Sequence, residues 1–198
     1  MTELGRSLTH AIAELRALGT SFALVGGLAV SVRAEPRLTL DADLAVAVTD
    51  DAEAEVVVRH FVQAGYQLVA TIEQDAVGRL ATARLTRALD EHAIVTDLLF
   101  ASCGIEPEIV ARADVIEVLP GLTVPVASTG DLIAMKLLAR DDRRRPADAD
   151  DLAALAAVAT DDDWARALSG VGLIEARGFA RARDLGAALA QLRVAGAY

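Results

Sequence analysis

Residues 22–48 read FALVGGLAVSVRAEPRLTLDADLAVAV, and this stretch predicts how the whole chain is organised. The apolar run over residues 22–25 is typical of a short strand, and the pair Gly26 and Gly27 ends it. Residues 28–33 then predict a short helix. Paired glycines allow a close approach to the backbone, and the free N–H groups at a helix N-terminus bind phosphate. We therefore expect this turn to hold the phosphates of a ligand.

A second strand, predicted over residues 40–48, adds two carboxylates beside the turn. Side chains two apart on a strand point to the same face, so Asp41 and Asp43 share a face. Carboxylates this close stay ionised only when a cation or strong donors lie between them, and Mg²⁺ suits such oxygen ligands. Alone, a Gly-Gly pair is more often a plain turn, and an Asp-x-Asp strand end is more often a solvated edge. Their combination favours a site for a nucleotide and a metal ion.

Six residues of this stretch form one pattern, a glycine pair followed by R-x-T-x-D-x-D. They are Gly26, Gly27, Arg37, Thr39, Asp41 and Asp43. The pattern resembles the signature of the DNA polymerase β-type nucleotidyltransferase superfamily, and within it the AbiEii-type branch, which includes toxins of bacterial toxin–antitoxin pairs. The second glycine replaces the serine usual in the superfamily, which removes one hydroxyl that would contact phosphate.

The resemblance implies a chemistry and a set of roles. Asp41 and Asp43 would hold Mg²⁺ or Mn²⁺, while Gly26, Gly27, Arg37 and Thr39 would bind a nucleoside triphosphate (NTP). The enzyme would move a nucleoside monophosphate to an acceptor hydroxyl and release pyrophosphate. An AbiEii-like toxin implies an RNA acceptor, such as the 3′ end of tRNA, and a cognate antitoxin as partner.

A third carboxylate stands in the apolar run HAIVTDLLF, which predicts a strand over residues 92–100. A charge in a buried strand is costly unless it is paired or bound to a cation, so Asp97 is informative. It could be a strand-end aspartate in water, or one that pairs with an arginine. By resemblance it is the third metal-site carboxylate, which deprotonates or orients the acceptor hydroxyl.

Lys136 lies among apolar residues in a helix predicted over residues 129–140. On spacing alone it is a lysine that extends its charged end to water. Together with Asp148 and Asp151, however, it resembles the AbiEii-type lysine and downstream acidic motif, in which the lysine contacts the triphosphate. The two aspartates lie one turn apart and either orient Lys136 or anchor the next helix.

Arginines supply further candidates for phosphate contact. Residues 140–146 read RDDRRRP, in which Arg140 is a candidate for binding triphosphate or an acidic acceptor such as RNA. The same run, with its further arginines Arg143, Arg144 and Arg145, also fits a solvated loop. Arg33 is a second-rank candidate beside Arg37.

Composition limits the function. The chain has 198 residues and 54% hydrophobic residues, which predicts a folded core rather than disorder. A net charge of −10 argues against a broad nucleic-acid footprint, and 4% aromatic residues are too few for a base-stacking platform. The lone Cys103 excludes an internal disulfide and is expected to be a buried bystander. With neither a signal-peptide pattern nor a membrane-length apolar run, we expect a cytoplasmic protein.

The periodicity predicts an α/β fold, in which a small mixed sheet with flanking helices precedes a helical C-terminal part. Predicted helices span residues 2–18, 28–33, 51–64, 106–112, 129–140, 147–158, 162–168 and 178–194. Predicted strands span residues 22–25, 40–48, 66–71, 78–86, 92–100, 114–119 and 122–126, with a loop at 72–77 and a turn at 88–91. We expect residues 1–127 to form the nucleotidyltransferase core and residues 128–198 a helical subdomain.

Three other functions remain open at this stage. The acceptor could be a small molecule or a protein hydroxyl instead of RNA. The chain could be a catalytically silent nucleotide-binding regulator, although the complete set of Asp41, Asp43 and Asp97 argues against that. An enzyme that removes nucleotides or phosphates would usually carry histidine ligands, and the histidines here lack ligand-like spacing.

Overall fold

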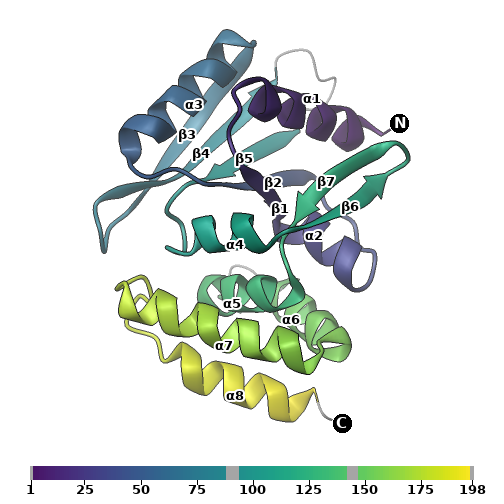
Figure 1. Ribbon diagram of the computed structural model, residues 1–198, viewed down its shortest axis with the longest axis vertical. Coiled ribbons are helices and arrows are strands. Elements are labelled where there is room, and N and C mark those ends of the chain that lie inside the picture. Colours follow the sequence, from purple (N-terminus) through teal and green to yellow (C-terminus); the bar gives the residue numbers. More distant parts are fainter. Residues whose placement is uncertain (1, 88–93, 142–146, 197–198) are drawn as a thin grey trace.

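The computed structural model describes residues 2–87, 94–141 and 147–196 of the chain. A mixed sheet of seven strands forms its centre, in the order β3-β4-β5-β2-β1-β7-β6 (Figure 1). The strands are β1 Phe22–Val25, β2 Asp41–Val46, β3 Tyr66–Gln74, β4 Arg79–Arg87, β5 Val95–Leu99, β6 Asp114–Leu119 and β7 Leu122–Val126. The predicted mixed sheet with flanking helices is confirmed.

Strand pairing puts the short apolar strands in the middle of the sheet. β1 runs antiparallel to β2, β2 runs parallel to β5, and β5 runs antiparallel to β4. All four residues of β1 are buried, as expected of a strand covered on both faces. The long hairpin of β3 and β4 leaves β3 as an edge strand with one paired side.

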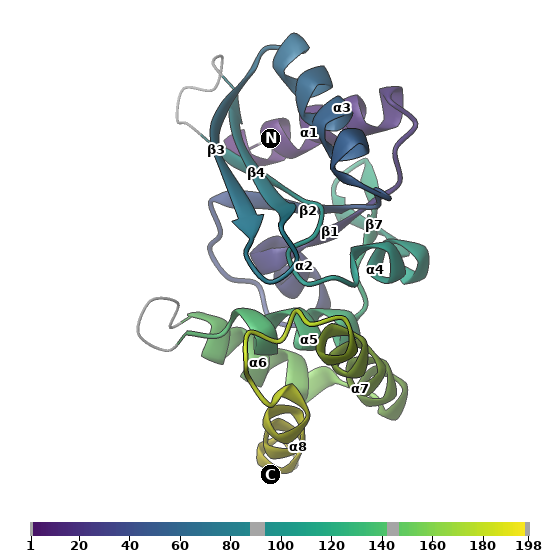
Figure 2. The ribbon, with the colours of Figure 1, turned by 90° about the vertical axis from the view of Figure 1, so that its left-hand side faces the viewer.

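Helices lie on both sides of this sheet. They are α1 Glu3–Ala17, α2 Gly26–Arg33, α3 Asp51–Gln63, α4 Glu106–Arg112, α5 Thr129–Ala139, α6 Ala147–Val158, α7 Asp161–Ala176 and α8 Leu185–Ala195. α1 and α3 cover one side, and α5 to α8 form a separate helical layer below the sheet (Figures 1 and 2). None of the described helices is long and apolar enough to cross a membrane.

The first helix of the helical layer, α5, has Ser128 as its N-cap residue. The Ser128 hydroxyl accepts a hydrogen bond from the Asp131 N–H at 3.2 Å and donates to the Asp131 carboxylate at 2.8 Å. A side-chain cap of this kind satisfies an N–H group that the helix leaves unpaired. The strands of the sheet all precede this point, whereas the division at residue 127 into two subdomains stays a prediction.

Two predicted boundaries near the site were wrong. α2 begins at Gly26 itself, because Val25 already serves as the extended residue before the helix. β3 continues to Gln74 through the predicted loop at 72–77, because it pairs with β4 along its whole length. In this added stretch Glu73 is exposed on the edge strand, whereas Gln74 is buried and donates to the Ser102 carbonyl, a long-range contact that the hydrophobic pattern cannot predict.

Two boundaries in the C-terminal part were also wrong. α7 runs past Ser169 to Ala176, because Gly170 packs against Ala134 and Ile105, where a Cβ would lie 3.2 and 3.3 Å from their side chains. α8 begins at Leu185 instead of residue 178, since an irregular turn precedes it. The predicted turn at 88–91 and the predicted strand start at His92 lie outside the described residues.

Candidate active site

Four strands align the predicted carboxylates in one row across the sheet. Asp43 of β2 lies opposite Asp97 of β5 on one side and opposite Val25 of β1 on the other. Asp97 in turn lies opposite Arg84 of β4. Residues opposite one another on neighbouring strands share a face, so Arg84, Asp97 and Asp43 point the same way. Asp41 lies two residues from Asp43 and joins this face.

The first glycine of the turn makes room for the second carboxylate of β2. Gly26 has φ of +66°, which a side chain rarely tolerates. A Cβ built on Gly26 would lie 1.8 Å from Asp43 Oδ2. The Asp43 carboxylate therefore packs directly on the backbone at the start of α2, which explains why this position must be glycine.

The second glycine makes room for the loop that leads into β2. A Cβ on Gly27 would lie 2.4 Å from Arg37 Nη2 and 3.1 Å from Thr39 Oγ1. Both predicted nucleotide-binding side chains therefore lie over the N-terminal turn of α2. The structure thus brings Gly27, Arg37 and Thr39 together, as the sequence pattern predicts.

We expect Gly26→Ala to damage catalysis more than stability. The left-handed backbone should lower the free energy of unfolding by about 1–2 kcal/mol, and displacement of Asp43 should lower the rate of transfer by about 10²-fold. Urea unfolding and a transfer assay measure the two effects. Gly65→Ala is the matched control, since Gly65 has φ of +91° with no atom near its Cβ position. Full activity in Gly26→Ala would show that the position of Asp43 does not limit the reaction.

Asp97 pairs with an arginine, one of the alternatives that the sequence left open. Arg84 Nε donates to Asp97 Oδ1 at 2.9 Å and Arg84 Nη2 donates to Asp97 Oδ2 at 2.7 Å, so the two side chains form a bidentate salt bridge. The Asp97 hydrogen bond and charge raise the pKa of Arg84, and the charges of Asp41 and Asp43 raise it further. All three predicted carboxylates are therefore close enough to act on one guanidinium.

Lys136 is buried in a network of charges rather than extended into water. Its Nζ lies 2.7 Å from a carboxylate oxygen of Asp148 and 2.7 Å from one of Asp151, and its side chain is 8% exposed. Arg37 Nε lies 2.6 Å from the other Asp151 oxygen. Asp151 thus connects the lysine of α5 to the arginine of the loop before β2, and the two cations balance the two carboxylates.

Two other arginines lie at the C-terminal ends of helices, Arg33 in the last turn of α2 and Arg140 directly after α5. Arg33 donates to the carbonyls of Val126 and Ala127 and pairs with Asp114, so it anchors α2 to β7. Arg140 caps the end of α5 and is not among the residues that line the cleft. Arg143, Arg144 and Arg145 lie outside the described residues.

A cleft of about 840 Å³ lies between the sheet and the helical layer and contains this site. It is lined by residues of the glycine turn, the loop before β2, the carboxylate row and α5. Two further side chains, Arg84 and Arg181, also line it, and the sequence analysis missed both. The sequence contains a pattern that could have identified Arg84, since it lies at the centre of the polar face of an alternating strand. Arg181 lies within a predicted helix, and no sequence pattern distinguishes it.

Cys103 borders the same cleft as a buried side chain, 2% exposed. Burial raises the pKa of its thiol well above the usual value, and the nearby Glu106 charge raises it further. The thiol therefore stays protonated at neutral pH, and the prediction of an unreactive bystander fits this environment.

The carboxylate pair of β2 is chemically suited to a divalent cation. Mg²⁺ commonly binds through one or two carboxylates, with substrate phosphates and water as its other ligands. Within the described ranges, no group of three or more His, Cys, Asp or Glu side chains is arranged to hold a metal ion. Both oxygens of Asp97 bind Arg84 instead, so the pair of Asp41 and Asp43 fits a cation better than the full trio does.

A glycine turn at a helix N-terminus, beside a carboxylate pair in one cleft, is the arrangement that the sequence pattern predicts for a nucleotidyltransferase. The model of the family described as "Nucleotidyl transferase AbiEii toxin, Type IV TA system" matches residues 8–192. The chain therefore belongs to the AbiEii nucleotidyltransferase toxin family, as the sequence resemblance predicts. No curated protein matches the sequence.

Several solved structures are similar to this chain at low sequence identity. An antigenic nucleotidyltransferase-like protein from Paracoccidioides brasiliensis has a TM-score of 0.53 and 17% identity, over 95% of this chain and 92% of that one. A putative nucleotidyltransferase from H. pylori has a TM-score of 0.48 and 17% identity, over 97% of this chain and 91% of that one. The nucleotidyltransferase toxin MenT4 from Mycobacterium tuberculosis H37Rv has a TM-score of 0.45 and 18% identity, over 89% of this chain and 74% of that one. At this level of identity the similarity to the first of these concerns the fold alone.

Proposed function

We propose that this protein transfers a nucleoside monophosphate from an NTP to the 3′ hydroxyl of an RNA, and that the reaction depends on a divalent cation. The observation that carries the proposal is the row of Asp43, Asp97 and Arg84 beside the Gly26 turn. Membership of the AbiEii family supports nucleotidyl transfer. The acceptor, the cation and pyrophosphate release belong to the proposal.

The triphosphate would lie against the N-terminus of α2, where backbone N–H groups favour an anion. Arg37 and Thr39 lie over this turn and would contribute further donors. An ammonium group has three N–H donors, and Lys136 uses two of them on Asp148 and Asp151. The third would point into the cleft, toward the phosphates, while the aspartates hold the lysine in place.

Asp41 and Asp43 would hold Mg²⁺ or Mn²⁺. A bound cation would neutralise the charge that develops on the reacting phosphate. The carboxylates themselves would otherwise repel a triphosphate, because several negative charges would share one cleft. The carboxylate pair of β2 thus supports the proposed requirement for a cation.

Asp97 would accept the proton of the acceptor hydroxyl. A carboxylate has about four lone-pair sites, and the guanidinium of Arg84 uses two of them. The others can accept a hydrogen bond from the hydroxyl while Arg84 keeps the carboxylate in one orientation. Arg84 is thus a positioning residue for the base in this proposal.

The test is a transfer assay with purified protein, each labelled NTP, Mg²⁺ and total tRNA. Parallel reactions replace tRNA by a protein mixture or by aminoglycosides, which represent the other acceptor classes. Label that moves to tRNA alone, and not in the Asp41→Ala/Asp43→Ala variant, supports the proposal. Label on protein or on the small molecule would replace the RNA acceptor, and loss of label in EDTA would support the cation.

If no acceptor takes label, NTP binding measured by calorimetry separates the remaining candidates. Binding without transfer would mean that the acceptor class is none of those supplied. An absence of binding would favour a catalytically silent regulator. A cognate antitoxin is the partner that the family description suggests, and co-expression with the neighbouring gene product would test whether growth arrest is relieved.

A further inference from the structure

The turn between α7 and α8 holds a strained conformation beside the cleft. Arg181 and Ala182 have φ of +54° and +58°. No other non-glycine residue in the described part of the chain has a positive φ. Side chains disfavour this left-handed region, and such residues persist where the surrounding structure enforces them, often at functional sites.

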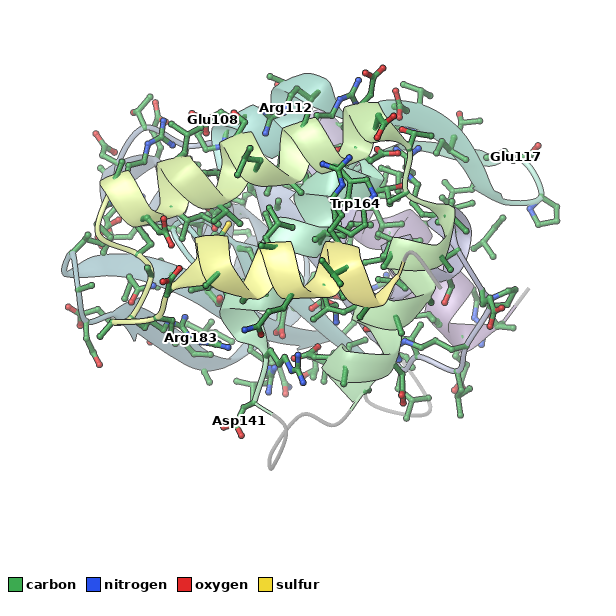
Figure 3. All side chains as sticks on the ribbon, turned by 90° about the horizontal axis from the view of Figure 1, so that it is seen from below. Glu108, Arg112, Glu117, Asp141, Trp164 and Arg183 are labelled. Carbon is green, nitrogen blue, oxygen red and sulfur yellow. The ribbon has the colours of Figure 1, made fainter. Side chains whose placement is uncertain are left out.

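Two sets of contacts enforce this turn. Arg183 Nη1 donates to the carbonyls of Leu138 and Arg140 at 2.8 and 2.9 Å, which ties the turn to the end of α5. Figure 3 shows Arg183 on the same side of the helical layer as Asp141, the residue after this end. Phe179 is 7% exposed and lies on Gly104, where a Cβ would approach its ring to 2.5 Å.

A third contact joins the turn to the sheet. Arg177 donates to the Gly104 carbonyl and pairs with Glu108 of α4. Gly104 belongs to the segment that directly follows β5, the strand that carries Asp97. The strained turn is therefore clamped between the helical layer and the part of the sheet that holds the proposed base.

The clamped turn presents a cation to the cleft. The described cationic side chains that line the cleft are Arg37, Arg84, Lys136 and Arg181. The first three each pair with a carboxylate, whereas Arg181 is exposed and forms no ion pair or side-chain hydrogen bond with any described residue. Its charge is the one in this set that the structure leaves for a ligand.

The position of the turn favours one of the two substrates. Gly26, Gly27 and Arg37 mark the NTP side of the cleft, next to β1 and β2. The turn of Arg181 is held both by the end of α5 and by Gly104 in the segment after β5, the strand that carries Asp97. We propose that Arg181 binds a backbone phosphate of the RNA acceptor close to its reacting end. This inference rests on the proposed function, because it names the acceptor side of the same cleft.

A single phosphate contact also suits the charge of the chain. A net charge of −10 argues against a broad basic surface that follows an RNA backbone. One exposed arginine at the mouth of the cleft would hold only the end of the strand. Acceptor affinity should then be modest and only weakly dependent on salt, as one released counterion predicts.

Arg181→Ala should raise the KM for tRNA about tenfold and leave the KM for the NTP within about twofold. Binding of a short fluorescein-labelled single-stranded RNA, measured by anisotropy at several salt concentrations, should weaken in parallel. The slope of log K against log salt should fall by about 0.7 for the lost phosphate contact. Arg181→Lys should keep part of the affinity, because lysine keeps the positive charge but cannot make the bidentate hydrogen bonds of a guanidinium.

Two controls separate binding from folding. Arg181→Gly removes the side chain and also the left-handed strain, so its melting temperature should equal or exceed that of the wild type while RNA binding falls. Arg59→Ala removes an exposed arginine from α3, on the other side of the sheet, and should change neither KM. A role in folding alone would instead leave RNA binding of Arg181→Gly intact.

The outcomes distinguish this inference from the proposed function. If the wild type transfers label and Arg181→Ala keeps its KM for tRNA, the inference fails alone. If the KM for the NTP rises instead, Arg181 serves the triphosphate and the inference is overturned. If no label moves but RNA binding is weaker in Arg181→Ala, the inference holds and the transfer proposal fails. If the wild type neither transfers nor binds RNA, both fail.

Discussion

Asp43→Asn abolishes nucleotidyl transfer, with an expected loss of at least about 10³-fold in kcat. The substitution keeps the shape of a half-buried side chain that packs on Gly26, and it removes one of the two charges that would hold the cation. The fold should therefore survive, because Asn fills the same space. Single-turnover transfer, together with a thermal melt of each variant, measures the effect on catalysis apart from the effect on folding.

The matched control for this prediction is Asp162→Asn. Asp162 is exposed in the first turn of α7, away from the cleft lining, so its loss should leave transfer unchanged. Binding of Mn²⁺ in the presence of an NTP, followed by electron paramagnetic resonance, gives a second measurement. Asp41→Ala/Asp43→Ala should lose this binding. Transfer by Asp43→Asn at a tenth or more of the wild-type rate would remove Asp43 from the cation site.

Lys136→Met lowers the free energy of unfolding by about 3–5 kcal/mol, the usual cost of breaking a buried ion pair from one side. Lys136 lies 2.7 Å from both Asp148 and Asp151, and all three side chains are at most 8% exposed. Methionine has a similar length, so packing is kept while two buried carboxylates lose a shared cation. Urea unfolding at neutral pH measures the change.

The triple variant Lys136→Met/Asp148→Asn/Asp151→Asn separates the structural from the catalytic role. It removes the unbalanced carboxylates along with the lysine and should recover much of the stability. NTP binding should stay weak, because the ammonium group proposed to reach the phosphates is still missing. Recovered NTP binding would mean that Lys136 acts only through folding, and a loss of less than 1 kcal/mol in Lys136→Met would mean that water already shields the network.

Much of the site follows from the sequence because its parts are close along the chain. Asp41 and Asp43 share a face through the two-residue period of a strand, and the glycine turn must follow the short apolar strand before it. The cap at Ser128 is equally local, since it needs only a hydroxyl three residues before an N–H group. The pattern also identified Asp97 as a charge that requires a partner.

Only the tertiary structure shows which side chains pair with Asp97 and with the other charged residues of the site. Arg84 meets Asp97 because β4 and β5 pair in one register, and a shift by one residue would turn the arginine to the opposite face. Asp151 lies 114 positions after Arg37, and its contacts with both Arg37 and Lys136 join the loop before β2 to α5 and α6. The hydrophobic periodicity of a segment predicts which face of its helix or strand a side chain occupies. These ion pairs depend instead on how different helices and strands pack against one another.

The placement of Arg181 shows the same limit in the C-terminal part. An alanine-rich pattern predicts a helix over residues 178–194, since local propensity favours it. The contacts of Phe179 and Arg183 with distant segments override that propensity and hold Arg181 in a left-handed turn. Local sequence thus determined the strands, the turn and the carboxylates of this protein. Long-range packing decided which charges neutralise one another and which cation faces the cleft, because those energies depend on residues that meet only after folding.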